Sequence, residues 1–184
     1  MTKLFFSKVL QSTPHVFLKN KNFRTKNVSI LVSDTWLYFL ALHLKFSSAS
    51  YPSQLVEIFA YDTPVSANNS SDVARVSNAT LVYQFHNLFS QERVFVFASS
   101  LKQSYSAAPK SLTELFACAA WLEREVGEMH GLCFEGKKDL RNLMLQYGDS
   151  SAPFRKSYPS IGLKEVVFDS VTDTLIQVPV STQI

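Results

Sequence analysis

Residues 121–158 read WLEREVGEMHGLCFEGKKDLRNLMLQYGDSSAPFRKSY, a stretch in which charged side chains are far denser than in the rest of the chain. Acids and bases alternate along it, whereas a nucleic-acid-binding arm or an acidic tail needs a block of one sign. Two interpretations stay open: a solvated helix face with weak ion pairs, or paired charges that enter a protein interface. The charges concerned are Glu123, Arg124, Glu125, Glu128, Glu135, Lys137, Lys138, Asp139 and Arg141.

The stretch also carries a series of motifs at fixed spacing: aromatic-x-Glu-Arg-Glu, acidic-Met, Gly-x-x-Phe, Asp-Leu-Arg, Tyr-Gly and Pro-x-Arg-Lys-x-aromatic-Pro. Their residues are Trp121, Glu123, Arg124, Glu125, Glu128, Met129, Gly131, Phe134, Asp139, Leu140, Arg141, Tyr147, Gly148, Pro153, Arg155, Lys156, Tyr158 and Pro159. In this order the chain resembles the thirty-kilodalton subunit of respiratory complex I, also called NADH dehydrogenase subunit 9. Weaker similarity extends from about residue 28 to about residue 180. The chain departs from the family pattern at Gly127, Lys137, Lys138, Asp149, Ser151, Ala152 and Ser157.

The resemblance implies a non-catalytic subunit in the hydrophilic arm of the proton-pumping NADH:ubiquinone oxidoreductase, on the matrix side of the inner mitochondrial membrane. Such a subunit supports assembly and docks on the forty-nine-kilodalton subunit, which helps to form the quinone-reducing site, and on other hydrophilic-arm subunits. FMN and iron-sulfur clusters are then expected in other subunits. The resemblance implies these contact residues: Glu123, Arg124, Glu125, Asp139, Leu140, Arg141, Tyr147, Gly148, Pro153, Arg155, Lys156 and Pro159. A matching subunit of a chloroplast, bacterial or hydrogenase-type complex is the alternative within the same superfamily.

Length and composition predict a single core. A chain of 184 residues with 46% apolar content can bury one domain of ordinary size. Its net charge of +3 comes largely from the first residues, where six basic side chains precede the first acid, Asp34. We interpret this start as a structural leader, because transit peptides are usually rich in Arg. The longest apolar run, residues 36–42, is shorter than the roughly 20 residues that cross a bilayer.

The periodicity of apolar residues predicts an α+β fold, with helices on one face of a largely antiparallel sheet and a long extended C-terminal tail. Residues 62–77 are rich in Ser, Asn and Asp, which predicts a mobile connection. We expect a basic leader over 1–27, an α+β core over 28–135, and a motif loop and tail over 136–184 that dock on the partner. The expected elements are a helix at 3–11, a strand at 28–32, a helix that follows a cap at Ser33 or Asp34 and extends to about residue 46, strands at 55–61, 80–86 and 93–99, a long helix, and strands at 164–168 and 174–178. The strands at 80–86 and 93–99 should form an antiparallel hairpin.

The long helix is expected to begin at a capping box formed by Ser111 and Glu114 and to end at Gly131. Between these points Leu112, Leu115, Ala119, Leu122, Val126 and Met129 recur at helical spacing. This pattern predicts one apolar face over five turns, packed on the sheet.

The residues that could carry chemistry do not form a recognisable catalytic set. Glu123 and Glu125 point to different sides of a helix, which disfavours an acid and base pair. His130 and Cys133 have a spacing that suits metal ligands but lack a second ligand pair. No phosphate-binding glycine motif and no cysteine cluster occurs, so we expect no redox cofactor in this chain. An RNA-binding α+β domain is the alternative of a different class, because aromatic strands and a basic leader are its ingredients.

Overall fold

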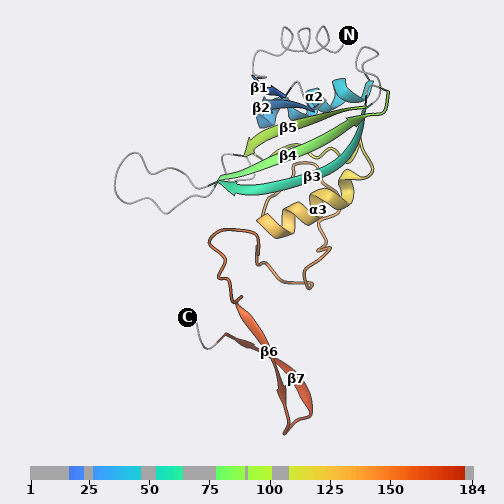
Figure 1. Cartoon of the computed structure of the whole chain (residues 1–184). Helices are drawn as coiled ribbons and strands as arrows, with labels where there is room; N and C mark the ends of the chain where they lie inside the picture. The colour runs from blue at the N-terminus through green and yellow to red at the C-terminus, as the bar shows by residue number, and fades with distance from the viewer. Residues whose placement is uncertain are drawn as a thin grey trace.

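In the computed structural model the described part of the chain contains a five-stranded mixed sheet, two helices and a separate two-stranded hairpin (Figure 1). The structure describes residues 17–22, 27–46, 53–63, 78–89, 91–100 and 108–180. The strands of the large sheet are β1 (Phe17–Asn22), β2 (Asn27–Val32), β3 (Ser53–Thr63), β4 (Asn78–Asn87) and β5 (Glu92–Ser100). Their order is β1-β2-β5-β4-β3, so β1 and β3 form the edges.

The sheet is largely antiparallel, as the sequence predicts. The pairs β1·β2, β3·β4 and β4·β5 are antiparallel, and β4·β5 is the predicted hairpin. The pair β2·β5 is parallel, with Val28 opposite Val94 and Ile30 opposite Val96. A parallel pair needs a crossover connection, and here the chain passes through a helix and two strands before β5 returns beside β2.

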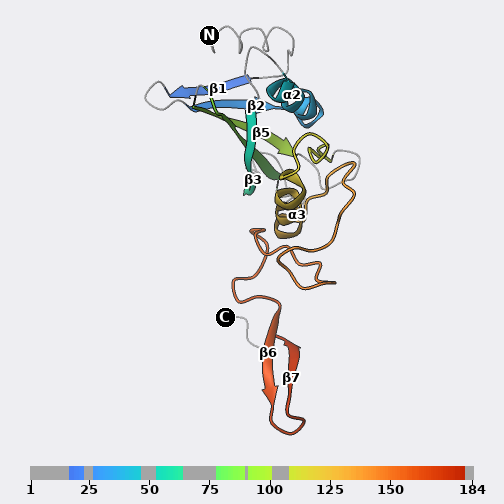
Figure 2. The ribbon, with the colours of Figure 1, turned by 90° about the vertical axis from the view of Figure 1, so that its right-hand side faces the viewer.

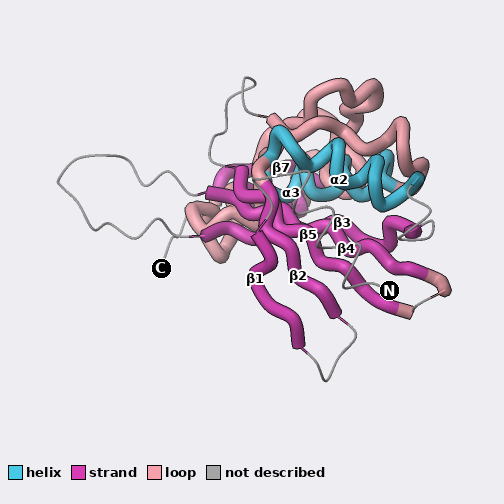
Figure 3. Tube along the Cα trace, turned by 90° about the horizontal axis from the view of Figure 1, so that it is seen from above, coloured by secondary structure: helices cyan, strands magenta, loops and turns pink. Residues whose placement is uncertain are grey.

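Both helices lie on one side of the sheet (Figures 2 and 3). Helix α2 (Asp34–Phe46) buries Leu37, Leu40, Ala41 and Leu44. Alternate residues of the strands point to the same side because side chains in a strand alternate between faces. The fully buried strand residues on that face are Ile30, Leu55, Leu81, Tyr83, Phe85, Val96 and Ala98. The core is therefore a single layer between the helices and the sheet.

The second helix begins later than the capping-box pattern predicts. Helix α3 runs from Ala119 to His130, and its N-cap residue is Cys118. Residues 112–116 form a separate turn, in which the Phe116 N–H donates to the carbonyl of Leu112. The side chain of Ser111 does not pair with Glu114, which is exposed. Instead its hydroxyl donates to Glu123 Oε2 at 2.7 Å. The predicted start at Ser111 is wrong because that hydroxyl has a tertiary partner.

Glu123 joins three segments of the chain inside the core. Its side chain is fully buried, at 0% exposure. Besides the Ser111 hydroxyl, it accepts the backbone N–H of Leu112 at 2.7 Å. The Lys137 ammonium lies 3.1 Å from Oε2 and also donates to the carbonyl of Ala120. A buried carboxylate is stable only when its charge and its lone pairs are matched, so this arrangement sets the distance between α3 and the segments on either side of it.

Helix α3 ends as predicted at Gly131, which has a left-handed φ of 65°. A side chain here would collide with the guanidinium of Arg155, so both the conformation and the close approach favour glycine. After the loop that follows, β6 (Lys164–Asp169) and β7 (Thr174–Pro179) form an antiparallel C-terminal hairpin. Their bounds agree to within one residue with the strands predicted at 164–168 and 174–178. Of the other expectations, the 3–11 helix and residues 64–77 lie outside the described residues, while residues 62 and 63 belong to β3.

We predict that Glu123→Ala lowers the free energy of unfolding by about 3 to 5 kcal/mol, because it leaves the buried Lys137 ammonium without its counter-charge. Urea denaturation of the 184-residue chain measures this change. Glu125→Ala, on the same helix but outside this network, serves as the matched control and should change the midpoint little. Equal losses in the two variants would contradict the assigned role of Glu123.

Candidate functional site

The segment that follows α3 is held by charged side chains of the helix. We call residues 136–163 the motif loop. The carboxylate of Glu128 accepts the backbone N–H groups of Leu143, Met144 and Leu145, at 2.8, 2.6 and 3.4 Å. Unpaired backbone groups cost free energy when they leave water. A single helical carboxylate thus fixes three consecutive residues of a segment that has no helix or strand of its own.

Arg124 holds the same loop by donating hydrogen bonds to backbone carbonyl groups of the loop. Its Nε donates to the carbonyl of Arg141 at 2.7 Å, and Nη2 donates to the carbonyl of Asn142 at 3.0 Å. A third guanidinium nitrogen lies 3.5 Å from Asp139. Asp139 also forms a bidentate pair with the Arg141 guanidinium, at 3.0 and 2.9 Å. Hydrogen bonds from the Arg141 side chain and backbone hold the pKa of Asp139 well below its ordinary value.

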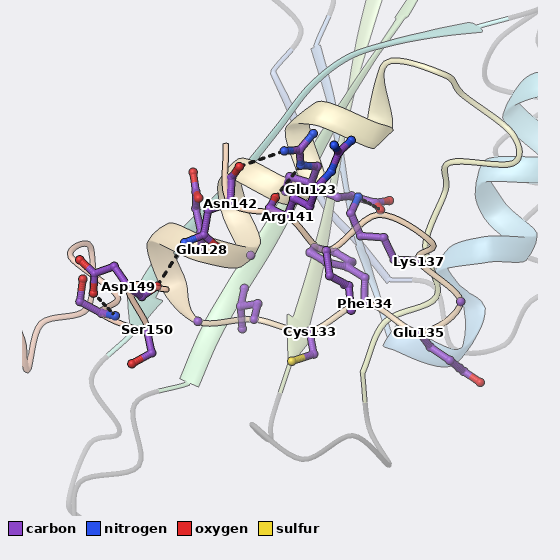
Figure 4. A pocket seen from close by; sticks show the side chains of 17 residues that line it. Glu123, Glu128, Cys133, Phe134, Glu135, Lys137, Arg141, Asn142, Asp149 and Ser150 are labelled. Carbon is purple, nitrogen blue, oxygen red and sulfur yellow. Dashed lines mark hydrogen bonds and ion pairs between the residues drawn. The ribbon is translucent and has the colours of Figure 1, made fainter. Parts of the chain in front are cut away.

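A pocket of about 540 Å³ lies between α3 and the motif loop. Figure 4 shows Asp149 and Ser150 at one end of it and Lys137 and Glu135 at the other. Its apolar lining comes from Leu132, Phe134 and Leu140. The basic groups Arg124, Lys137 and Arg141 line it as well, and each already has a partner within the chain. The pocket is therefore a cleft in a charged surface, and its basic side chains already bind partners within the chain.

Farther along, three consecutive residues attach the motif loop to the core. We call residues 154–156 the clamp. The Phe154 N–H donates to the carbonyl of Met129 at 3.0 Å, and the Lys156 N–H donates to Asp62 Oδ2 at 3.1 Å. Between them the Arg155 guanidinium donates to the carbonyls of His130 and Gly131, at 2.8 and 3.1 Å. A cation at the C-terminus of a helix meets unpaired carbonyl groups and the negative end of the helix dipole.

Arg155 has a role in the fold, because its guanidinium caps the C-terminal end of α3. Glu123 is buried completely and its carboxylate is used inside the chain, so we leave it out of the proposed contact surface. Glu125 is half-buried, and Arg141 is 71% exposed. Contact of these residues with a partner stays a prediction.

The structure brings the remaining predicted residues onto the motif loop but not into one cluster. Leu140 and Tyr147 are 71% and 76% exposed. Gly148 has a positive φ of 83°, and Pro153 and Pro159 are half-buried. Sequence reasoning missed Asp62 and the loop-binding role of Glu128. Glu128 could have been suspected from its place in the motif, whereas Asp62 is 94 positions away from the residue that it binds.

Large apolar side chains are exposed along the motif loop and on both faces of the C-terminal hairpin. On the hairpin, Phe168 is 58% exposed, Val171 is 90% exposed and Leu175 is 73% exposed. Further exposed residues of this region are Met144, Phe154, Ile161, Leu163, Val166, Val167 and Ile176. A lone two-stranded hairpin is only marginally stable in water, and large exposed apolar surfaces are typical of interaction sites.

The described residues contain neither a group of metal ligands nor a helix that could cross a membrane. No three of their His, Cys, Asp or Glu side chains gather as ligands, and His130 and Cys133 do not form such a set. Neither α2 nor α3 has the length and apolar character of a membrane-crossing helix.

The chain is similar to proteins of known families. The family model described as "Respiratory-chain NADH dehydrogenase, 30 Kd subunit" matches residues 30–164. NADH-ubiquinone oxidoreductase subunit 9 of Paramecium primaurelia is 37% identical over 125 residues, which cover 66% of this chain and 57% of that protein. The C subunit of the NADH-quinone oxidoreductase of Paramagnetospirillum magneticum is 27% identical over 172 residues, covering 94% of this chain and 80% of its own. The chain thus spans less than two thirds of the Paramecium relative.

Two solved structures share the fold. A trypsin-resistant fragment of Nqo5 superposes with a TM-score of 0.54 at 20% identity, covering 73% of this chain and 98% of the fragment. A chain of the archaeal membrane-bound sulfane sulfur reductase complex superposes with a TM-score of 0.61 at 20% identity, covering 86% of this chain and 82% of its own. At this identity the likeness concerns the fold alone. The family match over most of the chain agrees with the motifs of residues 121–159, and we conclude that the chain belongs to the family of the 30 Kd subunit of the respiratory-chain NADH dehydrogenase.

Proposed function

We propose that the chain is a hydrophilic-arm subunit of a proton-pumping NADH:ubiquinone oxidoreductase, non-catalytic by itself, that docks on the forty-nine-kilodalton subunit. The docking surface consists of the motif loop and the C-terminal hairpin. The observation that carries the proposal is the exposed apolar surface of this region. Val171, Leu175 and Tyr147 are each more than 70% exposed.

Physical chemistry supports a docking role for these segments. Burying a large apolar side chain contributes roughly 1.5 to 3 kcal/mol, and the free chain leaves a whole group of such side chains in water. The hairpin shows exposed side chains at nearly every position of β6 and β7. A partner that covers both faces of the hairpin would supply the burial that the chain itself does not.

The charges of the motif loop support selectivity in the same proposal. Arg141 is exposed beside the pocket, and its geometry is set by two hydrogen bonds to Asp139. Because Arg124 and Glu128 hold the backbone beneath it, this charge is presented at a fixed place. Charges at fixed places select a partner by electrostatic complementarity more than they add affinity.

Cofactors and location are part of the proposal. FMN and iron-sulfur clusters belong to other subunits, and the chain sits on the matrix side of the inner mitochondrial membrane within a complex of many subunits. The relative from Paramecium is named as an NADH-ubiquinone oxidoreductase subunit, which supports the mitochondrial version. The bacterial relatives, named as subunits of an NADH-quinone oxidoreductase, keep the bacterial counterpart as the second candidate. Family membership leaves the RNA-binding alternative without an observation in its favour.

We predict that Leu175→Ser weakens incorporation into the membrane complex by about tenfold or more, the equivalent of about 1.4 kcal/mol. The melting temperature of the isolated chain should hardly change, because the side chain is 73% exposed. The measurement is the amount of this chain that copurifies with NADH-oxidising particles after mild detergent extraction. Leu88→Ser, which removes an exposed leucine at the β4–β5 turn, is the matched control. Normal incorporation of Leu175→Ser would contradict docking through the hairpin.

Arg141→Ala and Arg155→Ala should have different effects on the thermal stability of the isolated chain. The Arg141 side chain is exposed and pairs with Asp139 of its own loop. The loss of this side chain should therefore leave thermal melting unchanged, while incorporation into the complex falls about tenfold. Arg155→Ala removes two hydrogen bonds to helix-end carbonyls and should lower the melting temperature. Thermal melts and yields of assembled complex decide this. A destabilised Arg141→Ala chain with normal assembly would assign Arg141 to the fold.

We also predict that the purified chain has no visible absorbance from flavin or iron-sulfur and binds no NADH. The physical reason is the lack of a phosphate-cradling glycine motif and of a cysteine cluster in its sequence. Absorbance spectra and equilibrium dialysis with NADH measure this. A chromophore bound at a defined stoichiometry would show that the chain carries electrons itself.

A further inference from the structure

Two residues that contact the clamp each bury a polar atom that has no hydrogen-bond partner among the described residues. The atoms are Nδ1 of His130, the last residue of α3, and Oδ1 of Asp62, near the end of β3. The two residues are only 7% and 8% exposed. A buried polar group without a partner is costly, and such a group calls for an explanation. Neither atom takes part in the pocket or in the proposed docking surface.

All three residues of the clamp contact these two residues. The ring of Phe154 stands edge-on to the His130 imidazole, with centroids 5.6 Å apart. Lys156 donates its backbone N–H to the other oxygen of Asp62. Arg155 donates to the carbonyl of His130 itself. The attachments of the clamp to the core described above therefore all pass through His130, Asp62 or a neighbour of His130 in the chain.

The charges around the imidazole come from both sides. Asp62 lies on β3, the Arg155 guanidinium lies on the clamp, and the Lys156 residue is exposed. Burial lowers the pKa of His130 from its ordinary value; Asp62 raises that pKa and Arg155 lowers it further. An imidazolium formed here would lose hydration and would face the Arg155 cation. The closed clamp therefore prefers the neutral imidazole.

We propose that the clamp is an acid-sensitive latch, which opens when His130 takes up a proton and so frees residues 154–156, and the hairpin beyond them, from the α+β core. One proton passes from solvent to the imidazole in each opening. Because the pKa of His130 is lower in the closed state than in the open one, stability of the closed clamp is fully present above about pH 6.5. That stability is lost as pH falls toward the lowered value. The inference concerns the chain alone and does not rest on the proposed partner.

Amide hydrogen exchange in the 184-residue chain tests the latch. The Phe154 and Lys156 N–H groups report the clamp, because their bonds to Met129 and Asp62 must break before they exchange. After correction for the intrinsic pH dependence of exchange, their opening constant should rise between about pH 7.5 and 5.5, by at most about tenfold per pH unit for one linked proton. Amides in the centre of β4 should show no such rise.

Three variants separate the latch from a general acid effect. In His130→Gln the rise should disappear, while His86→Gln, a half-buried histidine on β4, should keep it. Asp62→Asn keeps an oxygen for the Lys156 N–H but removes the charge that favours the imidazolium. The closed-state pKa of His130 should therefore be lower still, so the opening constant of Asp62→Asn should begin to rise at the same pH as in the parent chain and should go on rising to a lower pH.

The proposal is overturned by a clamp whose opening constant does not change with pH, or by an equal rise in His130→Gln. Should His130→Gln open the clamp at every pH, Asp62→Asn decides. An opening constant that levels off at the same pH as in the parent chain overturns the latch, and one that goes on rising to a lower pH supports it.

Discussion

The buried carboxylate of Glu123 is the constraint on which the second half of the molecule depends. A fully buried charge must be matched, and here the Ser111 hydroxyl, the Leu112 backbone N–H and the Lys137 ammonium match it from two places in the sequence, one on each side of α3. This requirement brings the segments before and after α3 to the same point of the core. Helix α3 also packs against β3. The position of the helix in turn determines where its other side chains hold the motif loop.

Helix α3 directs much of its charge toward backbone groups. Glu128 serves three N–H groups, and Arg124 serves two carbonyls, while Arg155 of the clamp serves two carbonyls at the helix end. A long segment without helix or strand has many backbone groups to satisfy. The dense charge of this region is therefore explained first by the construction of the motif loop. The exposed Arg141 and the apolar side chains around it are not used in this way, and under the proposed function they remain for the partner.

Local patterns in the sequence predicted those elements whose contacts are local. The two-residue alternation of 80–86 predicted β4, and that of 93–99 predicted β5. The run from 28 to 46 predicted β2 and then α2. The capping box failed because Ser111 could bind either of two glutamates, and a pattern over four residues cannot reveal a partner 12 positions away. The parallel β2·β5 pair and the bond between Lys156 and Asp62 join residues far apart in sequence. A single sequence contains no signal for such distant pairs.

The uncovered hairpin has a thermodynamic consequence for any association that covers it. Transfer of apolar surface out of water lowers the heat capacity of the system. An interface built on Val166, Phe168, Leu175 and Ile176 would therefore form with a strongly negative heat capacity change. Hydrophobic attraction of this kind weakens on cooling. The attachment of this subunit through the hairpin would then weaken on cooling.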